Sequence, residues 1–161
     1  MEAADLRKIY DAVTLEELLA ELQQQGRLTE EERAVIRRKE LLAFFASDLA
    51  KRMQKADKIH KEQPFAMLVE PKEVFLDDIY QNMEEFIQIN GIIDCYFVEE
   101  NAVVLVDYKS DRLWQEDAFR EKYKIQLRLY KEALERVTDL PVKACYIYAF
   151  APGKTIPIDF D

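Results

Sequence analysis

Apolar residues in the first third of the chain recur with the spacing of amphipathic helices. The first predicted helix carries a stripe of leucines at Leu15, Leu18, Leu19 and Leu22. Thr14 followed by Glu17 has the spacing of a capping box, so we expect this helix to begin after Thr14. Gly26 tolerates the left-handed conformation in which helices commonly end, so we expect the helix to end there.

The same signals recur twice before residue 57. Thr29 followed by Glu32 predicts the cap of a second helix. Ser47 predicts the start of a further short helix that reaches about Ala56. These segments are rich in Glu and Lys, as expected for solvent-facing helices that bury one apolar stripe.

After residue 57 the pattern changes to short apolar runs that are typical of strands. The predicted elements are a strand from near Ile59 to Pro71, a loop or short turn over 72–82, an extended segment over 86–93, a hairpin turn near 99–102, a helix over 115–137 and a strand over 142–150. Gly91, inside the extended segment, predicts a bulge or a bend. Strands joined by a long helix favour an α/β fold.

Composition bounds the class of protein. A chain of 161 residues, 49% of them apolar and 34% charged, is long enough for one domain with its own core. It has no apolar run of roughly 18 residues, so we expect no membrane-spanning helix. Cys95 and Cys145 lie in apolar strand-like segments, which predicts buried reduced thiols in a cytoplasmic protein. The net charge of −9 argues against tight unaided binding to DNA, although a metal ion would offset part of it.

Two acids and a lysine interrupt the apolar hairpin. A turn centred between Glu100 and Asn101 places Asp94 opposite Asp107, with Cβ atoms ~5 Å apart. Lys109 follows two residues later and points to the same face. Facing carboxylates repel unless one is protonated or a cation lies between them, and their oxygens suit Mg²⁺ or Mn²⁺. The alternatives are a strand-edge acid or a simple Asp–Lys ion pair across the strands.

The predicted helix over 115–137 adds two polar groups to this region. The apolar stripe of this helix includes Tyr123 and Tyr130. Gln126 lies four residues before Tyr130, so both share the helix face that carries the stripe. A buried amide and phenol need partners. Either they satisfy each other in the core, or they reach the end of the sheet and position a substrate.

The ordered set of these motifs resembles a known family. The segments that carry the resemblance are Gly91-Ile-Ile-Asp94, Asp107-Tyr-Lys109, Gln126-Leu-Arg-Leu-Tyr130, Lys61-Glu-Gln-Pro-Phe65 and Phe44-Phe-Ala-Ser-Asp-Leu49. Together they resemble the PD-(D/E)xK nucleases of the RecB-like group. Within that group the chain is most similar to the C-terminal nuclease domains of AddA subunits in AddAB helicase–nucleases, and the similarity covers nearly the whole chain.

The resemblance implies a restriction-endonuclease-like core, in which helices flank a mixed β-sheet. Residues 1–56 would form a helical segment packed on the core, and residues 57–161 the nuclease core of one structural domain. The implied metal ligands are Asp94, Asp107 and the backbone carbonyl of Tyr108, with Mg²⁺ or Mn²⁺ as the cofactor. The remaining implied site residues are the catalytic Lys109, the DNA-positioning pair Gln126 and Tyr130, and as a further candidate Glu62, an acid that matches a family position without an assigned role.

The implied function is a DNA exonuclease domain in double-strand break repair and recombination. Its expected partners are DNA, the helicase portion of a longer chain and an AddB-type subunit, with no membrane. The family's metal-binding His lies in an upstream helix, whereas the single His60 lies beside the Lys61–Phe65 motif. We therefore expect a segment that begins after that motif and is weakly active alone. The alternatives are a non-catalytic binding scaffold of the same fold and a metal-free interaction domain.

Overall fold

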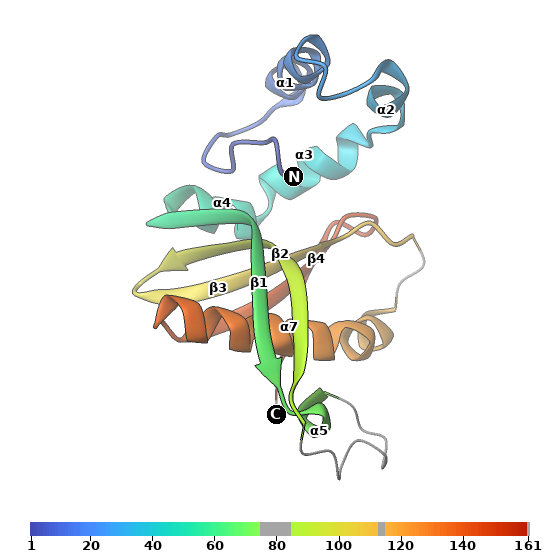
Figure 1. The fold of residues 1–161 in the computed structure, drawn as a ribbon. Coiled ribbons are helices and arrows are strands. Elements are labelled where there is room, and N and C mark those ends of the chain that lie inside the picture. The colour runs from blue at the N-terminus through green and yellow to red at the C-terminus, as the bar shows by residue number, and fades with distance from the viewer. Residues whose placement is uncertain (75–84, 113–114, 161) are drawn as a thin grey trace.

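A mixed five-stranded sheet forms the centre of the molecule, in the order β1-β2-β3-β4-β5 (Figure 1). The computed structural model describes residues 1–74, 85–112 and 115–160. The strands are β1 (Lys58–Val69), β2 (Ile87–Glu99), β3 (Ala102–Lys109), β4 (Val142–Ala149) and β5 (Lys154–Pro157). Only the β3–β4 pair is parallel among these strands, and helix α7 (Glu116–Thr138) connects its two members. A parallel pair requires such a crossover, so the α/β prediction is confirmed.

Helices cover both faces of the sheet, as Figure 1 shows. On one face, Phe44, Leu49 and Met53 pack with strand residues such as Phe97 and Tyr148. On the other face, α7 supplies a buried stripe that packs on β2, β3 and β4; its buried members are Phe119, Leu127 and Leu134. Strands β2, β3 and β4 therefore send alternate side chains into two separate cores.

Four helices precede β1 in the sequence. They are α1 (Ala12–Gln24), α2 (Glu30–Val35), α3 (Arg38–Ala46) and α4 (Asp48–Lys55). Of these, α3 and α4 supply the buried helical residues of the first core. The predicted caps at Thr29 and Ser47 are confirmed, because each side chain accepts a hydrogen bond from a backbone N–H in the first turn. The prediction that Thr14 caps the first helix was wrong.

The first helix begins earlier because a different pair caps it. The Asp11 carboxylate accepts a hydrogen bond from the Thr14 N–H at 2.8 Å, and the Thr14 hydroxyl accepts one from the Asp11 N–H at 2.9 Å. Thr14 thus occupies the third helical position of a capping box that Asp11 opens. Gly26, with φ of +69°, follows the end of this helix as expected.

The β2–β3 hairpin has the predicted register. Glu100 and Asn101 both have positive φ values, as a two-residue turn of this kind requires. The strands then pair continuously from Glu99↔Ala102 to Cys95↔Val106.

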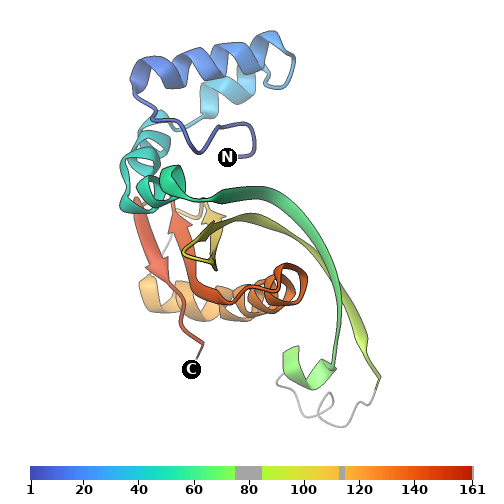
Figure 2. The same cartoon turned by 90° about the vertical axis from the view of Figure 1, so that its left-hand side faces the viewer.

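The paired strands β1 and β2 extend beyond the other three strands of the sheet and curve around α7 (Figure 2). Its irregular position is Glu62, whose φ is +50° and which has no partner in an otherwise continuous ladder. Gly91 pairs regularly with Phe65, so the first of the two predicted alternatives, a bulge, was wrong. Gly91 instead makes room for the Phe65 ring, because an added Cβ would lie 2.5 Å from the ring atom Cε1.

The remaining elements differ from the prediction only in detail. Helix α5 (Pro71–Val74) opens the segment expected to be a loop or short turn, and residues 75–84 lie outside the described ranges. The short edge strand β5 was not predicted from the sequence. Cys95 and Cys145 are buried and free, as expected. In the part of the chain that the structure describes, every helix is too short or too polar to cross a membrane.

Candidate metal and catalytic site

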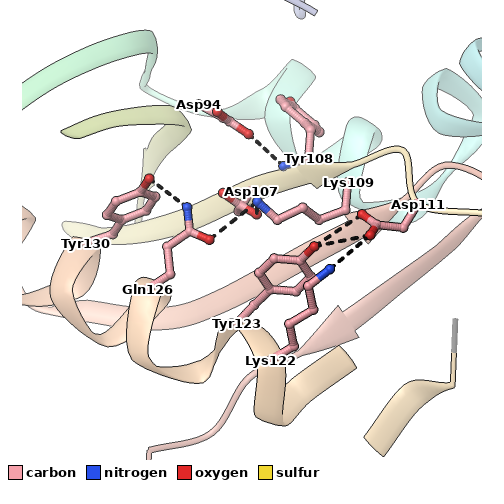
Figure 3. Close-up of polar contacts among 9 residues, drawn as sticks. All are labelled: Asp94, Asp107, Tyr108, Lys109, Asp111, Lys122, Tyr123, Gln126 and Tyr130. Atoms are coloured by element: carbon pink, nitrogen blue, oxygen red, sulfur yellow. Dashed lines mark hydrogen bonds and ion pairs between the residues drawn. The ribbon is translucent and has the colours of Figure 1, made fainter. Parts of the chain in front are cut away.

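The candidate site lies where β2 separates from β3. The ladder between these strands ends at Cys95↔Val106. The next residues, Asp94 and Asp107, are therefore not paired with each other through the backbone. The Asp94 side chain bridges the opening, because its Oδ2 accepts a hydrogen bond from the Tyr108 N–H at 2.9 Å (Figure 3). The Asp94 carboxylate thus takes the place of a backbone acceptor on the neighbouring strand and satisfies this N–H.

The same opening exposes a backbone oxygen. Within a strand, the N–H and C=O of one residue point to the same edge. The Tyr108 N–H points to Asp94, whereas the carbonyl of the next residue, Lys109, points to β4 and accepts a hydrogen bond from the Phe150 N–H at 2.9 Å. The Tyr108 carbonyl therefore faces the opening beside Asp94.

Asp107 is the buried charge of the site. Its side chain is 1% exposed, and burial raises its pKa from 3.8 to about 6, although Lys109 lowers the pKa and the nearby Asp94 raises it further. The Asp107 Oδ2 atom forms an ion pair with the Lys109 Nζ atom at 2.6 Å, and among the described residues no donor is aligned on it for a hydrogen bond. The Lys109 ammonium group offsets part of the cost of burying this charge, but burial still raises the Asp107 pKa, and a divalent cation would offset more of that cost.

Lys109 lies between β3 and α7. Its side chain is 17% exposed, and its ammonium group contacts Asp107 on its own strand. On α7, its Nζ atom lies 3.4 Å from Gln126 Oε1 and 4.4 Å from the centre of the Tyr123 ring. This ammonium group therefore touches a carboxylate, an amide oxygen and an aromatic ring, and all three hold it at the opening.

Gln126 and Tyr130 share one face of α7, as predicted. The Gln126 Nε2 atom donates a hydrogen bond to the Tyr130 hydroxyl at 2.7 Å, which turns the amide oxygen toward Lys109 (Figure 3). The Tyr130 ring also packs edge-on against Phe65 of β1, with ring centres 5.4 Å apart. The structure thus brings Gln126 to the predicted site, while Tyr130 acts on it through that amide.

Glu62 lies near this group without joining it. It is exposed and stands opposite Asp94 at the interruption of the β1–β2 ladder. Burial raises the pKa of Tyr108 well above its ordinary value, and the negative charges of Asp94 and Glu62 raise it further. Glu62 is therefore close enough to act on the opening electrostatically, although none of its described contacts assigns it a role.

Three residues next to Lys109 were not predicted to belong to the site. Tyr123 was counted only as a member of the apolar stripe, and Lys122 and Asp111 were not assigned to the site. The Tyr123 hydroxyl donates to the Asp111 carboxylate, at 3.2 Å from Oδ2, and Lys122 pairs with the same carboxylate at 3.1 Å. One signal was available, since Tyr123 lies three residues before Gln126 and so shares its helix face.

The residues at the opening fit a hard divalent cation. They offer two carboxylates and a backbone carbonyl, which are oxygen ligands of the type that Mg²⁺ and Mn²⁺ prefer. The described ranges hold no cluster of three or more His, Cys, Asp or Glu side chains arranged for a metal ion. Mg²⁺ commonly takes only one or two protein carboxylates and completes its shell with water and phosphate oxygens, so the set at the opening is sufficient for this ion.

The chain is similar to proteins named as the A-type subunits of ATP-dependent helicase/nucleases. One from Clostridium botulinum (strain Loch Maree / Type A3) is 36% identical over 162 aligned positions, which cover 99% of this chain and 12% of the relative. One from Clostridium novyi (strain NT) is 40% identical over 136 positions, which cover 81% and 11%. One from Thermoanaerobacter sp. (strain X514) is 34% identical over 158 positions, which cover 97% and 13%.

The chain thus spans about one-eighth of the length of these relatives. A family model describes almost all of it, because the model of the PD-(D/E)XK nuclease superfamily matches residues 4–156. The mixed sheet with helices on both faces is the restriction-endonuclease-like arrangement expected for that family. The chain therefore belongs to the PD-(D/E)XK nuclease superfamily.

Proposed function

We propose that this chain is a metal-dependent DNA nuclease domain that hydrolyses phosphodiester bonds. The observation that carries the proposal is the buried Asp107 carboxylate, which is paired with Lys109 at an opening that Asp94 also lines and whose Oδ2 has no aligned hydrogen-bond donor among the described residues. In a family of nucleases, a buried carboxylate of this kind is best explained as a ligand for a cation.

Each residue has a distinct role in this proposal. Asp94, Asp107 and the Tyr108 carbonyl would hold Mg²⁺ or Mn²⁺. When bound, such an ion supplies positive charge to the phosphate and lowers the pKa of a water molecule. Lys109 would orient that water or stabilise charge on the phosphate. Gln126, held by Tyr130, would position Lys109 and the DNA backbone.

The wider role follows from the relatives. They are named helicase/nuclease subunits, so we propose that this chain is the nuclease portion of a longer subunit that unwinds and trims DNA. Its action would be exonucleolytic, in double-strand break repair and recombination, with an AddB-type partner subunit. Because bacterial DNA lies in the cytoplasm, we propose that the domain acts there. A helicase that delivers DNA would also overcome the repulsion from a net charge of −9.

Two parts of the proposal concern the chain itself. Residues 1–56 would form a helical segment and residues 57–161 the nuclease core, joined by the packing of Phe44 and Met53 on the sheet. Activity of the chain alone would be weak, because the family's metal-binding His in an upstream helix has no counterpart here, and the single His60 lies in β1, stacked on Tyr96. A longer natural protein that supplies a further ligand would bind the metal more tightly.

Metal binding and cleavage test the proposal together. Calorimetric titration with Mn²⁺ should show one site in the chain, and Asp107→Asn should remove it. In the longest natural protein that carries this chain, the same substitution should abolish cleavage of linear DNA. Glu99→Gln is a matched control, since Glu99 pairs with Arg52 at the hairpin end of the sheet, away from the opening. Cleavage that survives Asp107→Asn would refute the nuclease role.

A second candidate is a non-catalytic scaffold of the same fold. It is favoured by the internal partners of both acids, since Asp94 accepts the Tyr108 N–H and Asp107 contacts Lys109. In that case Mn²⁺ would show no binding heat, and the chain would still bind DNA or a protein partner. The calorimetric titration therefore separates the two candidates.

A further inference from the structure

Tyr123 lies between two ammonium groups at the edge of the candidate site. Its ring centre is 4.4 Å from Lys109 Nζ and 4.7 Å from Lys122 Nζ, both close enough for cation–π attraction (Figure 3). The two lysines differ in exposure, because the side chain of Lys109 is 17% exposed and that of Lys122 is 57% exposed. The contact with the mostly desolvated Lys109 is the stronger of the two.

A hydrogen bond fixes the ring in this position. The Tyr123 hydroxyl donates to Asp111, at 3.4 Å from Oδ1 and 3.2 Å from Oδ2. Asp111 is itself paired with Lys122 at 3.1 Å. Its carboxylate also increases the negative potential of the ring, since a phenol that donates to an anion becomes richer in electrons. That change strengthens the attraction between the ring and Lys109.

Simple packing does not account for this arrangement. Tyr123 does contact the apolar core, since its ring lies edge-on against Phe119 with centres 5.0 Å apart. Leucine would make a similar apolar contact at this position of α7. Only a phenol provides both a face for an ammonium group and a donor for Asp111.

We propose that Tyr123 is a positioning residue for Lys109. The inference deepens the proposed function and rests on it, since Lys109 matters for cleavage only if the chain is a nuclease. In the structure, Lys109 is held by Asp107, Gln126 and Tyr123 together. A cation bound by Asp107 would weaken the first of these contacts. The ring and the amide of α7 then keep the ammonium group at the opening, where it faces the phosphate.

Nuclear magnetic resonance tests the contact without reference to activity. Protons above an aromatic face resonate upfield, so the Hε protons of Lys109 should be shifted upfield in the chain with ¹³C-labelled lysine. Lys109→Arg assigns the signal by removing it. Tyr123→Leu should move the signal to the ordinary lysine position, whereas Tyr123→Phe should keep most of the shift because it retains the ring.

Cleavage kinetics test the consequence in the longest natural protein that carries this chain. Tyr123→Leu should lower kcat roughly tenfold with little change in KM, as expected when a group acts in the transition state. Tyr123→Phe should restore most of kcat. Tyr146→Leu is the control, because it also removes a ring near a cation, 5.4 Å from Arg52, but on the face of the sheet opposite α7. It should change neither kcat nor the Lys109 signal.

The outcomes separate this inference from the proposed function. An unshifted Lys109 signal in a protein that cleaves DNA would overturn the role of Tyr123 and leave the nuclease role intact. A normal kcat for Tyr123→Leu would do the same. Absence of metal-dependent cleavage in the unaltered protein would overturn the proposed function, and the positioning role with it. Loss of kcat in Tyr146→Leu to the same degree would show a general effect on folding and refute the inference.

Discussion

Replacing Asp107 by Asn should stabilise the protein at neutral pH and should leave it about equally stable in acid. The substitution keeps the size and shape of a side chain that is 1% exposed, and it removes the charge. Asn therefore mimics the protonated form of Asp107. The difference in stability between the two proteins then measures the cost of ionising this carboxyl group inside the fold.

The magnitude follows from the pKa of Asp107. Burial raises this pKa from 3.8 to about 6, so between these pH values the unfolded chain loses a proton that the folded chain keeps. The free energy of unfolding of the wild type should therefore fall as pH rises through this window. At about 1.4 kcal/mol for each unit of pKa difference, the cost reaches about 3 kcal/mol above pH 6. It should vanish below the unfolded pKa, where both states are protonated.

Urea denaturation from pH 3.5 to 7.5, without metal, measures the effect. The free energy of unfolding of Asp107→Asn should exceed that of the wild type by about zero in acid and by about 3 kcal/mol at neutral pH. Mn²⁺ at about 100 times its Kd should then add about 2.7 kcal/mol to the wild type and nothing to the variant.

Glu99 provides a control of opposite sign. Its hydrogen bond with Arg52 lowers the pKa of Glu99, so this carboxylate stabilises the fold above its unfolded pKa, and the contribution is lost as pH falls. Glu99→Gln should therefore be destabilising at neutral pH and nearly neutral in acid. A gap for Asp107→Asn that does not change with pH, or that has the sign of the Glu99 control, would refute the assignment of Asp107 as a costly buried charge.

Three further predictions concern the strands around the opening. Asp94→Ala should lower the free energy of unfolding by about 1–3 kcal/mol, because the Tyr108 N–H loses its acceptor, whereas Asp94→Asn should keep the fold and lose metal binding. Urea denaturation measures the stability of the two variants and Mn²⁺ calorimetry their metal binding; equal stability would contradict the bridging role of Asp94. Gly91→Ala should lower the free energy of unfolding by about 1–3 kcal/mol, since the new Cβ would lie 2.5 Å from the Phe65 ring. In thermal melts, Phe65→Leu should rescue part of this loss; if the stability losses of the two substitutions simply add in the double variant, there is no clash. Glu62→Gly should raise the free energy of unfolding by about 1 kcal/mol because the φ of Glu62 is +50°, and weaker Mn²⁺ binding in the same variant would show that this acid also serves the metal site.

Local patterns in the sequence predicted the elements whose causes are local. The caps at Thr29 and Ser47 depend on side chains within one helical turn, and both are confirmed. The β2–β3 register depends on a two-residue turn, which fixes every later pair. The wrong prediction that Thr14 caps the first helix also has a local cause, because Asp11 occupies the N-cap position and accepts a hydrogen bond from the Thr14 N–H.

Side chains from distant segments meet at the candidate site, and the sequence predicted only part of that meeting. Periodicity showed that Gln126 faces the sheet, and the structure brings it to Lys109. Periodicity also placed Tyr123 on that face, but it could not distinguish a packing residue from one that contacts an ammonium group. That distinction depends on where Asp111 and Lys109 lie after the chain has folded.

The sequence by itself determined the α/β class, most element boundaries, the hairpin register and the order of the motifs that place the chain in its family. These features follow from hydrogen bonds and side-chain periods within short segments. Only the tertiary structure decided that β2 leaves β3 at Asp94, that Asp107 becomes a buried charge, and that α7 holds Lys109 from the other side. Burial and electrostatic coupling depend on atoms that are far apart along the chain, so the energetic properties of the site arise only when the sheet and α7 pack together.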